Sequence, residues 1–460
     1  MATLRKSTLG LILLDAMAVV FCFNFAMYLR GLPGGFVITP LLVPMVVSML
    51  AIYLVDGYKS HTDMMSVDYT SQHSIALLAA LVITVLLTFV VVPGGYELQS
   101  SRIVVLLSYA ILIPITLSYR RVAYARAARV LRNRRVVFVG DVASSRDFSE
   151  EYRTMGATFP VVYSLSSGVN SGYSTPPISL GFEADVRPIA QILDEIQAGQ
   201  LPVEAIVLRE AKDDLPELVS QRLMQLYFQG VPTYTLELFH QIYWNKIPLY
   251  RLNHTWLFQE GFRIAREPVF ERFKRATDLL LAGIALVLVS PLLLLCAISI
   301  KLDDRGPVFF TQNRIGKNRQ PFRIIKLRTM RTDVTTGDRY TQPGDSRITR
   351  VGHLLRASRL DEFPQLWNVL RGEMSMIGPR AEWDQLVQQY EREIPCYHFR
   401  HLVKPGITGW AQVNYPYGAN LEDTLRKLEY DLYYIRHFSF MLDATIVLKT
   451  IHTMLFGRGR

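Results

Sequence analysis

Long apolar segments occupy the first quarter of the chain and predict membrane helices. Each approaches the roughly 20 residues that a helix needs to cross a bilayer. A cleavable signal peptide is not expected, because no small-residue cleavage site follows the first segment and three similar segments come after it. The pattern predicts a membrane α-helical bundle of four spans within residues 1–120, at about Leu9–Tyr28, Phe36–Val55, Ile75–Val92 and Ile103–Leu117.

Basic residues at the ends of these segments predict their orientation. Arg5 and Lys6 precede the first segment, and residues 93–101, between the third and fourth, are almost uncharged. By the positive-inside rule, the N-terminus and everything after Arg120 are expected in the cytoplasm. Four crossings agree with this, because an even number returns the chain to the side of its N-terminus. Asp15, within the first segment, is a costly charge. A functional role for it and a place in the bundle without one are both open, and the second is favoured. The arginine run after the fourth segment comprises Arg120, Arg121, Arg126, Arg129, Arg132, Arg134 and Arg135.

Strand and helix patterns alternate between residues 121 and 260, which is typical of a parallel, doubly wound, Rossmann-like α/β domain. Gly140, at the end of the first strand, is followed by Asp141 and Val142 rather than by the glycines of a pyrophosphate-binding turn. A regulatory or oligomerising module, compatible with a homodimer, is therefore favoured over a nucleotide-binding one. The expected strands are Arg135–Gly140, Val203–Glu210 and Val231–Phe239, the expected helices Val186–Gly199 and Pro216–Gly230, and the expected loop Ser164–Pro177.

A fifth apolar segment, Leu279–Ile300, is interrupted by Ser290-Pro291. Proline removes a helical hydrogen bond and kinks or breaks the helix. Cations flank the segment, so a full crossing would put a basic C-terminal part outside, against the charge rule. A re-entrant helix over residues 275–301, broken at Ser290 and Pro291 and returning to the same face, is favoured over an ordinary kinked span.

The overall composition predicts that the protein has an anionic partner. The 460 residues are 50% hydrophobic and carry a formal net charge of +10, which favours a membrane surface, a phosphorylated substrate or nucleic acid as partner. No nucleic-acid motif, P-loop or Ser/His/Asp triad is present, so nucleic acid is not expected. The three cysteines are far apart and indicate neither a disulfide framework nor a zinc site.

The stretch from Arg356 to Arg380 carries the chemistry. Asp361 and Glu362 stand among four arginines, and Pro364 is placed to begin a short helix. Arginines and a helix N-terminus attract phosphate. Two carboxylates there would repel it unless a divalent cation lies between them or one is a nucleophile. An acidic pair that merely complements the helix dipole is the plainer alternative.

Upstream, the strand-like pieces at residues 308–312 and 321–330 flank a turn at Gly316. Lys326 and Arg328 share one strand face, which suits a diphosphate and equally a solvated surface. His353, His398 and His401 lack metal-ligand spacing and are expected to be structural or at the surface.

Five blocks occur in order in the last part of the chain: the Ser290-Pro291 helix, Lys326–Met330, Leu360–Gln365, Met376–Arg380 and Lys404–Gln412. Together they resemble the bacterial sugar transferase family, the polyprenyl-phosphate hexose-1-phosphate transferases (monotopic phosphoglycosyl transferases). The resemblance covers about residue 271 to the C-terminus, so a catalytic domain is expected at 265–460. The four spans and the degenerate α/β domain resemble the large members by architecture.

This resemblance implies transfer of hexose 1-phosphate from a UDP-hexose to undecaprenyl phosphate, with release of UMP, at the cytoplasmic face of a bacterial inner (plasma) membrane and in contact with its lipids. It implies that Asp361 forms a covalent phosphosugar intermediate and that Glu362 binds Mg²⁺. Residues matching Lys326, Arg328, Arg356 and Arg380 are implied phosphate and nucleotide contacts.

Three points stay open at this stage. The family usually has proline after Gly-Pro-Arg, whereas Ala381 stands here, which puts the rigidity of that loop in doubt. The sugar is not readable, with glucose or galactose favoured and an N-acetylated sugar open. A non-catalytic membrane scaffold that keeps the fold is the alternative function.

Overall fold

The computed structural model of the chain divides into two compact units, Met1–Asn245 and Lys246–Arg460. The structure describes residues 2–31, 36–59, 62, 64–91, 101–131, 133–156, 159–165, 184–209, 216–249, 268–331, 345, 347–415, 418 and 420–456.

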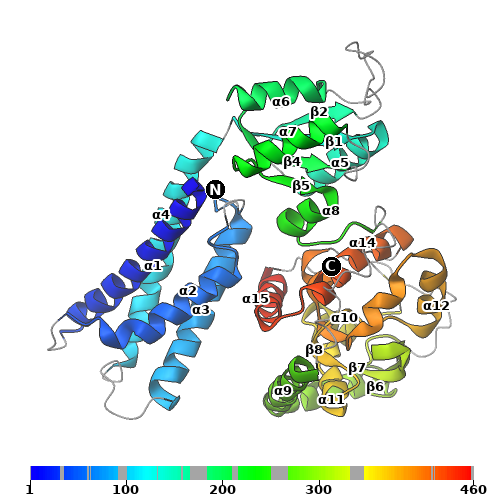
Figure 1. Cartoon of the computed structure of the whole chain (residues 1–460). Helices are drawn as coiled ribbons and strands as arrows, with labels where there is room; N and C mark the ends of the chain where they lie inside the picture. Colours follow the sequence, from blue (N-terminus) through cyan, green and yellow to red (C-terminus); the bar gives the residue numbers. More distant parts are fainter. Residues whose placement is uncertain are drawn as a thin grey trace. The chain divides into compact units, whose positions relative to one another are not determined.

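A helical bundle forms the first part of the first unit (Figure 1). By length and composition, Thr8–Leu29, Tyr69–Val90 and Arg102–Arg126 could each cross a membrane, as could one helix of the second unit. Helices α1 and α4 pack together, as do α2 and α3. The helices are α1 (Ala2–Leu29), α2 (Leu42–Leu54), α3 (Val67–Leu86) and α4 (Arg102–Leu131), with the short turns η1 (Thr39–Leu41) and η2 (Leu87–Val91).

The second helix of the bundle is shorter than the sequence predicted. Turn η1 has 3 residues and helix α2 has 13. At 1.5 Å per residue their combined length is about 24 Å, which is less than the roughly 30 Å thickness of the hydrocarbon core of a bilayer. Pro40 lies in the first turn of the helix, and Asp56, with a φ of 58°, lies just beyond its end. The predicted four-helix bundle is therefore present, but this helix alone is below the usual spanning length.

Asp15 lies inside the bundle, where it joins α1 to α4. Its two carboxylate oxygens accept hydrogen bonds of 2.6 Å from the two terminal nitrogens of Arg120, which is completely buried. The hydroxyls of Tyr58 and Tyr119 also donate to Asp15. A paired charge inside a helix bundle links helices, and here it joins α1 to α4.

A parallel sheet forms the rest of the first unit, with strand order β3-β2-β1-β4-β5. Figure 1 shows helices packed on it. The strands are β1 (Arg135–Gly140), β2 (Val161–Leu165), β3 (Asp185–Val186), β4 (Val203–Leu208) and β5 (Thr233–Thr235), and the helices are α5 (Val142–Thr154), α6 (Ile189–Gln197), α7 (Glu217–Phe228), α8 (Leu236–Phe239) and the turn η6 (His240–Trp244).

Strand β1 shows why helices cover both faces of the sheet. Phe138 packs with Phe148 of α5, whereas its neighbour Val137 packs with Ile192 of α6 and Leu223 of α7. Successive side chains of a strand point to opposite faces, so the sheet has two cores. The parallel, two-sided sheet predicted from the alternating pattern is present.

Two local predictions for this domain need correction or completion. The expected strand Val231–Phe239 ends at Thr235, because the hydroxyl of Thr235 accepts a hydrogen bond from Leu238 N and begins α8. The expected helix Val186–Gly199 begins only at Ile189, because Asp185 and Val186 pair with β2 as strand β3. Helix α5 and strands β2 and β3 were not expected from the sequence. The predicted loop Ser164–Pro177 lies, from residue 166 on, outside the described residues.

The N-terminus of α5 is occupied by a carboxylate. Asp141 accepts from Ser144 N and pairs with Arg209 at 2.7 Å. In a dinucleotide-binding domain the corresponding helix end receives the pyrophosphate. A capping carboxylate there repels an anion, in agreement with the missing glycines.

The second unit combines short strand pairs with helices around an apolar core. The antiparallel pair β6–β7 sets Phe310 opposite Lys326, and its two strands overlap the two strand-like pieces predicted on either side of the turn at Gly316. Ile247 and Leu249 pack into this unit's core. Its elements are α9 (Pro268–Asp304), β6 (Phe309–Ile315), η11 (Lys317–Arg319), β7 (Pro321–Leu327), α10 (Arg350–Ala357), η12 (Leu360–Glu362), α11 (Gln365–Arg371), β8 (Ser375–Ile377), α12 (Asp384–Glu393), η13 (Tyr397–Leu402), β9 (Gly406–Thr408), α13 (Trp410–Asn414), α14 (Leu421–Arg436) and α15 (Phe440–Phe456).

Helix α9 passes through Ser290 and Pro291 without ending, so the predicted break is not present as a gap in the helix. Proline at 291 leaves the carbonyl of Val287 without its helical N–H donor. The hydroxyl of Ser290 donates to that same carbonyl at 2.8 Å. Serine therefore replaces the hydrogen bond that its proline neighbour removes, which explains why the helix continues.

Both ends of α9 pack against the same unit. Before Pro291, Ala282 packs with Leu366 and Val369 of α11. After it, Cys296 and Ile300 pack with residues of β7 and α10. Between these contacts the helix is open, with Val287 and Leu288 each 73% exposed.

Candidate functional site

The adjacent carboxylates Asp361 and Glu362 lie on the short turn η12, between α10 and α11. Arg359 adopts a left-handed backbone, with a φ of 55°, and redirects the chain after α10. On either side of the carboxylates, Leu360 and Phe363 pack into two separate apolar clusters. The turn is thus anchored at both ends by apolar side chains, and the two acids between them have fixed positions.

Asp361 makes no hydrogen bond or ion pair with any residue that the structure describes. Burial raises the pKa of its carboxyl group, while the nearby cations Lys326, Arg356 and Arg380 act in the opposite direction. A half-buried carboxylate that lies in a positive field and has no bonded partner among the described residues keeps its lone pairs available for an electrophile.

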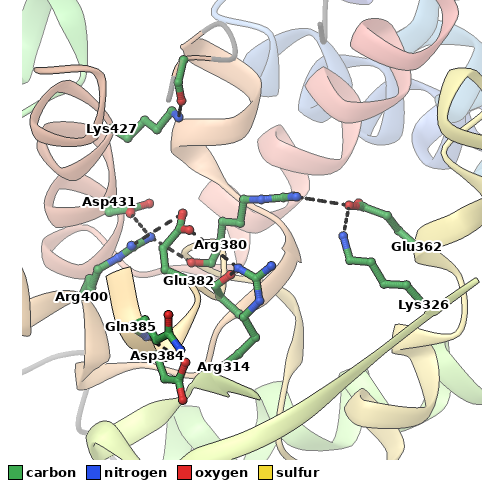
Figure 2. A network of polar contacts seen from close by, with 12 residues as sticks. Arg314, Lys326, Glu362, Arg380, Glu382, Asp384, Gln385, Arg400, Lys427 and Asp431 are labelled. Atoms are coloured by element: carbon green, nitrogen blue, oxygen red, sulfur yellow. Dashed lines mark hydrogen bonds and ion pairs between the residues drawn. The ribbon is translucent and has the colours of Figure 1, made fainter. Parts of the chain in front are cut away.

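Glu362 is in the opposite situation, because two cations contact its Oε1 atom. Lys326 Nζ lies 2.7 Å away and Arg380 Nη2 lies 3.4 Å away (Figure 2). Burial alone would raise the pKa of Glu362, but Lys326 and Arg380 outweigh it and lower the pKa to about 2. Glu362 is therefore ionised at every physiological pH. Its second oxygen, Oε2, receives no bond from the residues that the structure describes.

The predicted phosphate-binding cations come from separate elements. Lys326 is on β7, and Arg380 follows β8 and forms a bridge with Gly406. Arg356, on α10, donates from Nε to Thr329 Oγ1 at 2.8 Å. The structure thus brings these three predicted residues toward the carboxylate pair.

Arg328 is buried two residues beyond Lys326, and its guanidinium lies against Gly306. A Cβ at position 306 would lie 1.7 Å from Nη1 of Arg328, so glycine leaves the space that this side chain fills. Arg328 also donates from its backbone N to the carbonyl of Val308 at 2.9 Å, so both contacts lie in the segment between α9 and β6.

A buried network of hydrogen bonds centred on Arg400 holds the backbone at Arg380, and it was not predicted from the sequence. Arg400 donates to the backbone carbonyl of Arg380 at 2.9 Å and to Asp431 Oδ2 at 2.9 Å (Figure 2). Asp431 lies on α14, three residues after Leu428 and four before Ile435, both buried. A carboxylate on the apolar face of a helix predicts a buried cationic partner, so the signal was available.

The same contacts answer the question raised by Ala381. Arg314 donates from Nη1 to the carbonyl of Ala381 at 3.0 Å, next to the Arg400 bond to the Arg380 carbonyl. Two consecutive carbonyls of the loop are therefore held by arginines. The loop is fixed by hydrogen bonds and does not need the ring of a proline.

Comparison with known proteins decides the family. The profile of the bacterial sugar transferase family matches residues 269–457, which include the turn η12, Lys326 and Arg380. A UDP-N-acetylgalactosamine-undecaprenyl-phosphate N-acetylgalactosaminephosphotransferase of Aeromonas hydrophila is 40% identical over 295 residues, 62% of this chain and 69% of that protein. The chain belongs to the bacterial sugar transferase family.

Other members of this sugar transferase family match over shorter parts. A UDP-glucose:undecaprenyl-phosphate glucose-1-phosphate transferase of Klebsiella pneumoniae is 43% identical over 183 residues, 39% of each protein. The exopolysaccharide production protein PSS of Rhizobium leguminosarum is 41% identical over 194 residues, 40% of this chain and 97% of that protein. Except for the Aeromonas protein, the chain spans about 40% or less of the first relatives' length.

The donor atoms at the turn fit a divalent cation of the magnesium type. Mg²⁺ is usually held by one or two carboxylates, substrate phosphates and water rather than by a full protein cage. Oε2 of Glu362 and the carboxylate of Asp361 supply such oxygens. No group of three or more His, Cys, Asp or Glu side chains occurs in the described part of this sugar transferase, so the substrate would have to complete the coordination. His401 is buried beside Tyr397 and belongs to the core.

Proposed function

We propose that this sugar transferase moves a sugar 1-phosphate from a UDP-sugar to undecaprenyl phosphate. The products are undecaprenyl-diphosphate-sugar and UMP, and the reaction initiates synthesis of an exopolysaccharide, capsule or O-antigen. The observation that carries the proposal is the contrast within one turn. Among the residues that the structure describes, Asp361 has no hydrogen-bond or ion-pair partner, whereas the adjacent Glu362 is paired with Lys326 and Arg380.

In the first step the Asp361 carboxylate attacks the β-phosphorus of the UDP-sugar. A bond forms between a carboxylate oxygen and phosphorus, and the bond between this phosphorus and the bridging oxygen breaks, releasing UMP. In the second step an oxygen of undecaprenyl phosphate attacks the same phosphorus, and the Asp361 carboxylate leaves. Two displacements let a soluble donor and a lipid acceptor react at one site in turn.

Positive charge around the turn supports both displacements. Lys326 and Arg380, with Arg356 on the facing helix, supply donors for phosphate oxygens as charge accumulates on the leaving UMP. Glu362 would hold Mg²⁺ through Oε2 together with the donor diphosphate, and the ion would neutralise diphosphate charge. Lys326 keeps Glu362 ionised and oriented for that task.

Helix α9 supports a site at the membrane surface. Its two halves pack against the same unit, and its middle residues Val287 and Leu288 are exposed. A helix that crossed the bilayer would carry its halves to opposite sides, so this packing favours entry and return at one face. Together with the positive-inside rule, it supports our proposal that the catalytic unit lies on the cytoplasmic face of the inner membrane. Impermeant maleimide should then label Arg272→Cys and Lys301→Cys from the same side, and labelling from opposite sides would refute re-entry.

Two kinds of sugar are candidates for the group that is transferred, a simple hexose and an N-acetylated hexose. The Aeromonas relative is named for N-acetylgalactosamine and its match is longer than residues 269–457, whereas the Klebsiella relative is named for glucose. The hexose expected from architecture and an N-acetylated hexose are therefore tested side by side.

The experiment measures UMP release by the full-length protein in nanodiscs that contain undecaprenyl phosphate. Mg²⁺ is present, and UDP-glucose, UDP-galactose or UDP-N-acetylgalactosamine is added as the donor. We expect release with one sugar, abolished by EDTA and by Asp361→Asn. Asp194→Asn, at a carboxylate 70% exposed, is the matched control and should stay active. No UMP from any of these donors would favour the scaffold alternative.

A further inference from the structure

A small charged cavity lies at the start of α9, away from the carboxylate turn. Its volume is about 30 Å³, more than one water molecule needs. Six charged side chains line it, and none is a residue assigned to the transfer. The cavity adjoins the C-terminal end of α11, whereas Asp361 and Glu362 precede its N-terminal end. Helix α11 has seven residues, about 10 Å of helix. The charged residues are Glu271, Lys274, Arg275, Asp278, Lys317 and Lys404.

Most of these charges are neutralised locally. Glu271 accepts from Lys317 at 2.5 Å, and Lys274 donates to Asp443 at 2.5 Å. Asp278 accepts from Ser375 Oγ and from Met376 N, each at 3.0 Å. Once these are paired, Arg275 and Lys404 stand against the single carboxylate of Asp278. The cavity thus keeps an excess of about one positive charge.

The two remaining cations converge on one point. Arg275 donates to the carbonyls of Val369 and Leu370 at the end of α11. Beside it, a Cβ built at Gly372 would lie 3.3 Å from Arg275 Nη2 and 3.7 Å from Lys404 Nζ. Gly372 has a φ of 88°, so the left-handed cap of α11 keeps this place free of a side chain.

Lys404 has no hydrogen-bond or ion-pair partner among the residues described. Burial lowers the pKa of its ammonium group, and Arg275 lowers it further. A half-buried ammonium beside a guanidinium is unfavourable by itself, and an oxyanion between the two would relieve it.

The position of the cavity along α9 indicates where such an anion would come from. The apolar stretch begins at Leu279, directly after Asp278, and Leu280 is 63% exposed. Polar residues of α9 line the cavity in the two turns before that point. This is the level at which lipid headgroups meet a membrane helix.

We propose that Arg275 and Lys404 form a phosphate-binding site at the membrane surface, separate from the carboxylate turn. The ligand is one phosphate group, either the headgroup of an anionic phospholipid or soluble inorganic phosphate. The site requires membrane association but not the transfer reaction proposed above, so each can fail without the other.

The test uses the full-length protein in nanodiscs of phosphatidylcholine, with or without phosphatidylglycerol. Native mass spectrometry measures phosphatidylglycerol that stays bound after release from the disc, and radiolabelled phosphate measures the soluble ligand in discs of phosphatidylcholine alone. Lys404→Gln should weaken binding of the true ligand about tenfold, as expected for one charge-assisted bond. Lys301→Gln, an exposed lysine at the other end of α9, is the matched control.

The outcomes separate the two sources. Retained phosphatidylglycerol that is lost in Lys404→Gln and kept in Lys301→Gln assigns a lipid headgroup. Phosphate binding with the same dependence assigns a soluble oxyanion. If the native protein binds neither, or if Lys404→Gln and Lys301→Gln behave alike, the proposal is overturned. Circular dichroism of Lys404→Gln, compared with that of the native protein, separates a lost contact from a folding defect, and absence of binding to the native protein overturns the proposal whatever the variant does.

Discussion

At the scale of single residues, two neighbouring carboxylates on one turn have different environments. The pKa of Asp361 is raised by burial, while that of Glu362 is lowered to about 2 by Lys326 and Arg380. The family resemblance, not their position in the sequence, implied different roles for the two acids, and their described contacts differ as well. The contrast suits a nucleophile beside a permanently charged metal ligand.

Lys326→Met should lower turnover about 100-fold, in the range seen when one donor to a developing anion is lost. It removes both a phosphate donor and the 2.7 Å partner of Glu362. Arg323→Met is the matched control, because Arg323 is exposed and lies on the opposite face of β7. UMP release under saturating substrate measures the effect. A loss of only a few fold, equal to that of the control, would contradict the assigned role.

Asp431 should give the protein a specific pH dependence of stability. Burial raises its pKa from 3.8 to about 6, with Arg400 acting in the opposite direction. A carboxyl whose pKa is higher in the folded state favours folding when protonated. The contribution of Asp431 to the free energy of unfolding is roughly 3 kcal/mol at most. It is fully present below pH 3.8 and is lost as the pH rises to about 6.

Thermal unfolding of the native protein and of Asp431→Asn between these pH values checks this. The melting temperature of the native protein should fall relative to that of the variant as the pH rises. Asp384→Asn serves as control and should follow the native curve. A difference between native protein and Asp431→Asn that stays constant with pH would count against the assignment.

At the scale of elements, the sequence predicted what depends on local pattern. The β6–β7 hairpin, strand β1 and the apolar helices followed from periodicity and length. The contacts around Arg380 did not, because they join β7, the Arg380 loop, η13 and α14, which are distant in sequence. The hydrogen bond from Ser290 to Val287 likewise depends on a rotamer that periodicity does not reveal.

Gly406→Ala should disrupt the β8–β9 pair and, with it, the position of Arg380. A Cβ at residue 406 would lie 2.0 Å from Gly378 N and 2.5 Å from Thr408 O, both backbone atoms that cannot move aside cheaply. We expect roughly 1–3 kcal/mol of destabilisation, the usual cost of overpacking, and loss of most UMP release. Gly283→Ala has nothing within 4 Å, and should leave melting temperature and activity unchanged. Equal behaviour of the two variants would argue against the β8–β9 support.

At the scale of the whole molecule, the transfer chemistry belongs to the second unit. All the residues assigned to it lie between Lys246 and Arg460, and this unit has its own apolar core. The Rhizobium relative is matched over 97% of its length by 194 residues. Such a relative shows that the family includes proteins of about the size of this unit alone.

A fragment Lys246–Arg460, purified in detergent, should therefore release UMP with the same sugar preference as the full chain. The reason is that its core and its carboxylate turn make their contacts within the unit. Circular dichroism and the UMP assay together check the fragment. A folded fragment without activity would show that the first unit supplies part of the site.

The central claim is that Asp361 becomes covalently bound to the sugar phosphate. The most direct measurement is to incubate the full-length protein with the active UDP-sugar, without undecaprenyl phosphate, and to map the adduct by peptide mass spectrometry. We predict a single burst of UMP, no greater than one per protein, and a sugar phosphate on the peptide that contains Asp361, both absent in Asp361→Asn. UMP formed only when the acceptor is present, with no adduct on that peptide, would contradict the account.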